Sequence, residues 1–103
     1  MSDYSADVAK YTSTVNEEAV KAIVKYCGIA LQNRDSSMVS GTDPKELATV
    51  RDGFAAKKLG LAAAAADNGM QTVLATMKDS RSKSRVTFYY LLAEATGTLG
   101  KLS

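Results

Sequence analysis

The segment of residues 85–96, RVTFYYLLAEAT, constrains the fold of this chain more than any other stretch. Apolar side chains occupy nearly every position of the helix that it would form, so that helix has no continuous polar face to turn toward water. Such a helix belongs in the middle of a bundle. Ser84 precedes it as an N-cap and Gly97 follows it as a stop. We therefore expect the C-terminal helix to be central.

The first half of the chain predicts two helices. Residues 3–12 form a short one. A second begins at the capping box of Thr14 and Glu17, in which hydroxyl and carboxylate each accept from a backbone N–H group. Gly28 falls inside this second helix and marks a close helix contact. The helix carries one apolar stripe, made of Val20, Ile23, Val24, Cys27 and Leu31.

A polar loop is expected at residues 33–43, and two more helices are expected between this loop and the central helix at residues 85–96. Asp43 and Pro44 predict a helix start, and Gly60 predicts its end. A further helix covers residues 67–78. The alanine run at 62–66 either extends this helix or forms a preceding turn, and it offers a surface on which helices approach closely. Alternation of period two never lasts beyond four residues, so no strand is predicted.

The chain is therefore expected to be a single all-α domain of about five helices that spans residues 1–103. That length suffices to bury one core but not two. The sequence shows neither a signal-peptide pattern nor an apolar run long enough to cross a membrane. Cys27 is the single cysteine, and we interpret it as a buried apolar residue in a reducing cytoplasm.

Residue types needed for common catalytic sites are missing. The sequence has no histidine, no GxSxG motif, no phosphate-binding glycine loop and no zinc-type ligand set. The neighbouring carboxylates Glu17 and Glu18, and Asp43 with Glu46, fall in first turns of predicted helices, where the helix dipole favours negative charge. We expect no cofactor and no metal, and an enzyme of unrecognised type is kept as a third alternative behind the two binding roles given below.

One segment collects cations and hydroxyls immediately before the central helix. The net charge is +2, yet residues 78–103 hold five basic and two acidic side chains. Free N–H groups, the helix dipole and cations together favour an anion, so this turn predicts a phosphate contact, with a solvated turn as the alternative. The tentative anion-binding residues are Lys78, Arg81, Lys83, Ser84 and Arg85.

Two other polar features have weaker interpretations. The cluster of Arg34, Asp35, Ser36 and Ser37 is interpreted as a loop held by a local pair of Arg and Asp. Residues 61–78 have the small residues that a helix-turn-helix needs at its turn, but the second helix lacks branched anchors and base-reading side chains. The positive excess is also smaller than the basic stripe of a dedicated nucleic-acid binder.

Three segments resemble a small family of bacterial proteins of unknown function. They are CGIALQNRDSSMVS at residues 27–40, KKLGL at 57–61 and KSRVTFYYLLAE at 83–94. From the first of these segments to the last, they span most of the chain after the first helix. The resemblance implies a soluble bacterial helical domain and brings no activity or site residue.

Sequence alone thus favours a non-enzymatic helical module that binds a protein partner or a second copy of itself. The alternative is a binder of a phosphate-bearing ligand or nucleic acid through residues 78–85, by Arg81, Lys83 and Arg85 with support from Lys78. A membrane role is not expected.

Overall fold

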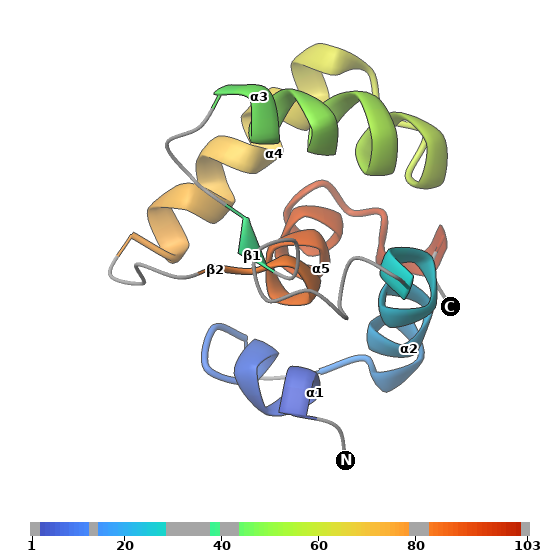
Figure 1. Ribbon diagram of the computed structural model, residues 1–103, viewed down its shortest axis with the longest axis vertical. Helices are drawn as coiled ribbons and strands as arrows, with labels where there is room; N and C mark the ends of the chain where they lie inside the picture. The colour runs from blue at the N-terminus through green and yellow to red at the C-terminus, as the bar shows by residue number, and fades with distance from the viewer. Residues whose placement is uncertain (1–2, 13–14, 29–37, 40–43, 79–82, 102–103) are drawn as a thin grey trace.

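Helix α5 (Arg85–Ala95) lies at the centre of the molecule, as predicted. In the computed structural model, which describes residues 3–12, 15–28, 38–39, 44–78 and 83–101, this helix runs between two groups of helices (Figure 1). Helices α1 (Asp3–Val8) and α2 (Glu17–Cys27) lie on one side. Helices α3 (Pro44–Thr49), η2 (Val50–Lys58) and α4 (Ala63–Thr76) lie on the other. Every residue from Arg85 to Ala93 is buried. The fold is a compact all-α globule.

Helix α2 differs from the sequence prediction at both ends. Thr14 lies outside the described residues, and the N-cap is Asn16, whose side-chain oxygen accepts from the Ala19 N–H group at 3.1 Å. Gly28 ends the helix, with φ of 46°, and is not in its interior. The prediction of a close helix contact at Gly28 was therefore wrong, because the glycine supplies a left-handed residue at the helix end.

Helix α3 (Pro44–Thr49) continues without a break into η2 (Val50–Lys58), a stretch of π-helix. The predicted signals at both ends hold: Pro44 is the first helical residue, and Gly60 has φ of 67°. Buried Phe54 and Leu59 are five residues apart, and in an α-helix they would diverge by about 140°. The i to i+5 bonding of a π-helix brings them to the same face.

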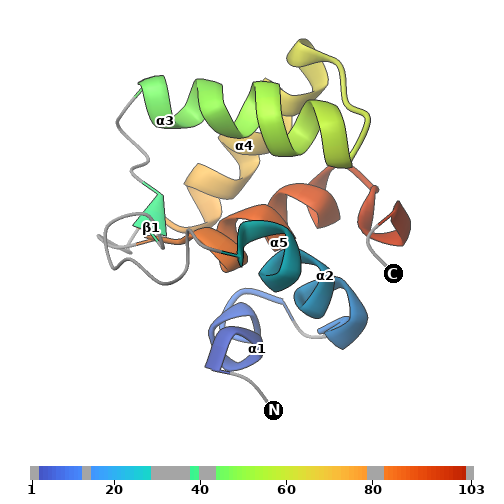
Figure 2. The ribbon, with the colours of Figure 1, turned by 45° about the vertical axis from the view of Figure 1, so that its right-hand side comes forward.

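Helix α4 (Ala63–Thr76) includes most of the alanine run, which settles the alternative that the sequence left open. It packs along α5 (Figure 2). The closest approach is at Gly69, where an added Cβ atom would lie 2.6 Å from the Thr96 methyl group and 2.8 Å from a Leu92 methyl group. The missing side chain of Gly69 thus allows α4 and α5 to approach closely. The prediction that the alanine run makes this approach was wrong, since four of its five alanines are exposed and only Ala66 is buried.

Two short strands form an antiparallel pair that the sequence did not predict. Strand β1 (Met38–Val39) pairs with β2 (Lys83–Ser84), with Met38 opposite Ser84. At two residues each, the strands are too short for a periodicity signal. They join the chain before α3 to the start of α5. A 3₁₀ turn, η3 (Leu99–Lys101), follows α5.

Helix α1 is shorter than predicted, since its α-helical part ends at Val8 and a turn follows. Its attachment to α5 is partly polar. The Thr87 hydroxyl donates to the Asp7 carboxylate, and the Thr12 hydroxyl donates to Glu94 at 2.9 Å. Within the described ranges, no helix has the length and apolar character needed to span a bilayer.

Candidate functional site

The basic turn that the sequence singled out is only partly described. Lys78 is exposed just after α4, and Arg81 lies outside the described residues. Lys83 belongs to β2, and Ser84 occupies the N-cap position of α5 without a side-chain capping bond. An anion site formed by these four residues stays a prediction.

Arg85, the fifth predicted member, belongs to the interior. Its side chain is 10% exposed, and its guanidinium donates to Glu46 at 2.5 Å. A second nitrogen donates to the Tyr89 hydroxyl at 2.9 Å. The guanidinium therefore has internal partners, and its predicted role toward an external anion stays a prediction. The sequence missed the pair because Glu46 is 39 positions away.

The second predicted polar feature, Arg34, Asp35, Ser36 and Ser37, lies outside the described residues. Met38 follows it directly in the chain and pairs with Ser84 at the end of the basic turn. The short β-ladder therefore connects the two polar segments that the sequence picked out.

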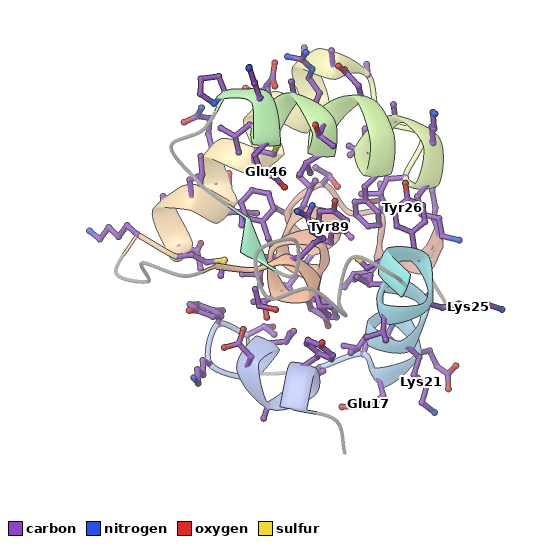
Figure 3. All side chains as sticks on the ribbon, in the orientation of Figure 1. Glu17, Lys21, Lys25, Tyr26, Glu46 and Tyr89 are labelled. Carbon is purple, nitrogen blue, oxygen red and sulfur yellow. The ribbon has the colours of Figure 1, made fainter. Side chains whose placement is uncertain are left out.

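Arg85 is linked through Tyr89 to a row of aromatic rings, and together they make one connected group, which we call the Arg85 cluster: Arg85, Glu46, Tyr89, Phe54 and Tyr26. The Phe54 and Tyr89 rings stack with centroids 4.1 Å apart, and Tyr26 meets Phe54 at 5.4 Å. The Arg85 guanidinium carbon lies 5.7 Å from the Tyr89 ring centre. Tyr26, Tyr89 and Glu46 occupy the space where α2, α5 and the α3–η2 helix meet (Figure 3).

Burial favours the neutral forms of two groups in this region, the Tyr89 hydroxyl and the nearby Cys27 thiol, by raising their pKa. Burial raises the pKa of the Cys27 thiol to about 11, although Arg85 opposes the shift. Burial also raises the pKa of Tyr89, again against the effect of Arg85. A thiol with that pKa carries almost no thiolate at neutral pH and is a poor nucleophile. Among the described residues, no group of three His, Cys, Asp or Glu side chains could hold a metal ion.

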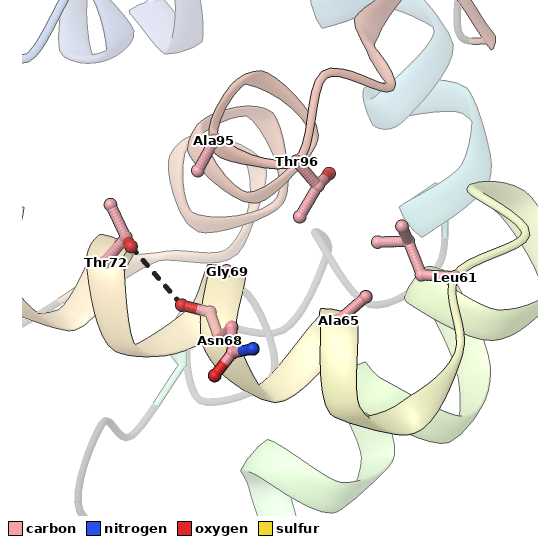
Figure 4. Close-up of a pocket in the computed structure, with 7 residues that line it drawn as sticks. All are labelled: Leu61, Ala65, Asn68, Gly69, Thr72, Ala95 and Thr96. Atoms are coloured by element: carbon pink, nitrogen blue, oxygen red, sulfur yellow. Dashed lines mark hydrogen bonds between the residues drawn. The ribbon is translucent and has the colours of Figure 1, made fainter.

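A groove follows the line along which α4 meets α5. It consists of two adjoining pockets of about 310 and 220 Å³ that share Thr72 and Ala95 in their walls. Figure 4 shows the larger one, with Gly69 at its base between the two helices. Its threonines mostly bond to their own helices: the Thr72 hydroxyl donates to the Asn68 carbonyl at 3.3 Å, and Thr96 donates to Leu92 at 2.8 Å. These bonds use the hydroxyl hydrogens of the two threonines within the protein.

A different hollow, of about 300 Å³, lies between α1 and α2. Its wall consists of Tyr4, Val20, Lys21, Val24 and Lys25, and we call it the α1–α2 hollow. Val20 is buried at its base, Tyr4 and Val24 are half-buried, and both lysines are exposed. Neither lysine makes an ion pair or a side-chain hydrogen bond in the part of the chain that the structure describes. Apolar surface and available cations are therefore adjacent here.

The fold and these surfaces define a small all-α domain whose described buried polar side chains pair with one another and whose surface carries a groove and a hollow. Comparison with known families gives the next step. The chain belongs to the family of proteins of unknown function DUF2853, whose model matches residues 3–100. A comparison with curated proteins finds no significant match.

Proposed function

We propose that this protein is a non-catalytic helical module that binds a protein partner through its surface. The observation that carries the proposal is the α1–α2 hollow, where half-buried apolar side chains lie beside two exposed lysines. Protein-binding sites combine an apolar centre with a polar rim that fixes orientation. The hollow has both parts.

The internal chemistry of the domain supports a binding role. Arg85 and Glu46 pair with each other, and the Cys27 thiol is protonated at neutral pH. A nucleophile would need a lowered pKa or an adjacent base. The described residues around Cys27 provide the opposite environment. The lone cysteine also suits a reducing compartment, and we place the module in the bacterial cytoplasm as part of the proposal.

A second candidate function is the binding of a phosphate-bearing ligand at residues 78–85. It is favoured by exposed Lys78 and by the N-terminus of α5, which has no side-chain cap. Polyphosphate binding should be strongest at low ionic strength. A titration with polyphosphate that gives no binding at low salt would exclude this candidate.

An unbiased selection tests the first proposal. Random peptides displayed on phage and selected on the immobilised protein should enrich one sequence family, and synthetic members of that family should bind the protein in solution. Sedimentation over a concentration series tests the alternative of self-association. If no peptide family is enriched and the chain is a monomer at all concentrations, the proposed function is wrong.

A further inference from the structure

The two lysines of the α1–α2 hollow restrict the chemistry of what can bind there. Lys21 and Lys25 are four positions apart in α2 and both line the hollow. Positions i and i+4 lie about 6 Å apart on one helix face. The hollow therefore presents two cations whose flexible stems start from neighbouring points at the edge of an apolar surface. Both lysines point outward from α2 in Figure 3.

We infer that the α1–α2 hollow binds an acidic amphipathic helix of a partner protein. One large apolar side chain of that helix would enter the hollow against Val20, Tyr4 and Val24. Two carboxylates, also placed at i and i+4 on the partner, would meet Lys21 and Lys25 at the matching spacing of about 6 Å. A helix docked through apolar anchors is a common mode of peptide recognition. This inference rests on the proposed function and names its partner class.

The size and charge of the hollow favour a protein segment over other anions. A volume of about 300 Å³ suits one anchor side chain and is at the lower limit for small-molecule sites. Two lysines are fewer than the basic stripe that nucleic acid requires. A membrane-binding helix carries a broad apolar face, whereas α2 buries its apolar residues Ala19, Val20 and Ile23 in the protein.

Three alanine-based helical peptides of about 15 residues serve as probes. Each carries a central phenylalanine, and the flanking i and i+4 positions hold glutamate, glutamine or lysine. Fluorescence anisotropy should show tightest binding for the glutamate peptide. Its binding should shift the backbone amide resonances of the α1–α2 hollow, and added salt should weaken it because the ion pairs are exposed.

Paired variants locate the site. Replacing Lys21 and Lys25 together with glutamine should weaken binding of the glutamate peptide about fivefold to tenfold, the expected effect of two exposed ion pairs. The matched control replaces exposed Lys57 and Lys58 with glutamine, which changes net charge equally on another helix. That control should change affinity less than twofold.

Several results would overturn the inference while leaving the proposed function intact. They are equal binding of the glutamine or lysine peptide, resonance shifts confined to another surface, and equal losses for the two lysine pairs. Absence of binding by the glutamate peptide also overturns it. Peptides enriched from the unbiased library would still show a binding module, so failure of the inference and failure of the proposed function are distinguishable.

Discussion

Cations meet apolar and aromatic surfaces at two places in this domain, with opposite consequences. In the Arg85 cluster the cation is buried, and both a carboxylate and a hydroxyl accept from it. In the α1–α2 hollow the cations are exposed and have no ion-pair partner among the described residues. The comparison separates charge used to hold helices together from charge that remains available to a partner.

The difference follows from which helices carry the charges. Arg85 begins α5, the helix that is buried along its length, so its guanidinium must find a partner inside the protein. Lys21 and Lys25 lie on the outer face of α2, whose other face packs on α5. A lysine there can keep its ammonium group in water while its stem covers apolar surface.

Breaking the buried pair should give the largest effect. We expect Glu46→Ala to lower the free energy of unfolding by about 2 to 3 kcal/mol, because it removes the carboxylate that pairs with a largely buried guanidinium. The value lies below the range for fully buried pairs because the Glu46 side chain is 26% exposed. Urea unfolding followed by circular dichroism measures the change.

Two further variants decide what the Glu46 result means. Replacement of both partners, Glu46→Leu with Arg85→Met, should recover much of the loss, since no unpaired charge remains. Glu18→Ala removes an exposed glutamate from the first turn of α2 and should have a much smaller effect. Similar losses for Glu18→Ala and Glu46→Ala would show that the Arg85 pair has no special structural role.

The pKa of the Cys27 thiol reports how strongly the protein interior disfavours a charged group. Its pKa is raised in the folded state, from 9.0 to about 11, so the folded protein holds the proton more tightly than the unfolded chain. This contribution to stability is present below pH 9 and is lost as the pH rises toward about 11. At neutral pH a shift of this size means roughly 100-fold less thiolate.

Thiol modification kinetics measure this shift directly. The rate of reaction with a disulfide reagent should rise with pH to a midpoint near about 11 for the folded protein and near 9 in urea. Fast modification of the folded protein at neutral pH would contradict the description of Cys27 as a protonated, inert thiol. Cys27 would then become a candidate nucleophile.

Tyr26 should contribute less than Glu46, because its side chain is at the edge of the cluster. The residue is 43% exposed, and its ring contacts Phe54 on one side. Tyr26→Ala should cost about 1 kcal/mol of unfolding free energy, the range for one aromatic contact, measured by urea unfolding. Tyr26→Phe keeps the ring and should leave stability unchanged. A large loss for Tyr26→Phe would instead assign the stability to the hydroxyl.

Local sequence signals predicted the parts of the fold that depend on neighbouring residues. Pro44 begins α3, Gly60 follows η2, and Gly97 follows α5 with φ of 71°. Each signal acts through its own backbone, since proline fixes φ and glycine permits a left-handed turn. The all-apolar segment also predicted the central helix correctly.

Other features depend on contacts between distant segments, and local patterns could not supply them. The partner of Arg85 is Glu46. The sequence already explained Glu46 as a carboxylate in the first turn of a helix, where the helix dipole favours negative charge, so the local pattern gave no reason to look for a distant partner. Asn16, the actual cap of α2, is also held by a distant residue: its backbone N–H group donates to the Tyr90 hydroxyl at 2.8 Å, across 74 positions. Candidate binding sites were the features that local patterns predicted least well, because a pattern does not show whether a cation is buried in the fold or exposed to a ligand.

The lysines of the α1–α2 hollow should give the smallest change in stability. Lys21→Gln combined with Lys25→Gln should alter the free energy of unfolding by no more than about 0.5 kcal/mol, because both side chains are exposed and glutamine has similar helix propensity. Urea unfolding beside the Glu46→Ala variant measures the contrast. A loss above about 1 kcal/mol would mean that the lysine stems hold Tyr4 and Val24 in place. The cations of the α1–α2 hollow and of the Arg85 cluster would then both stabilise the fold, to different extents. Weaker peptide binding by this variant would in that case result from a damaged surface and not from lost ion pairs.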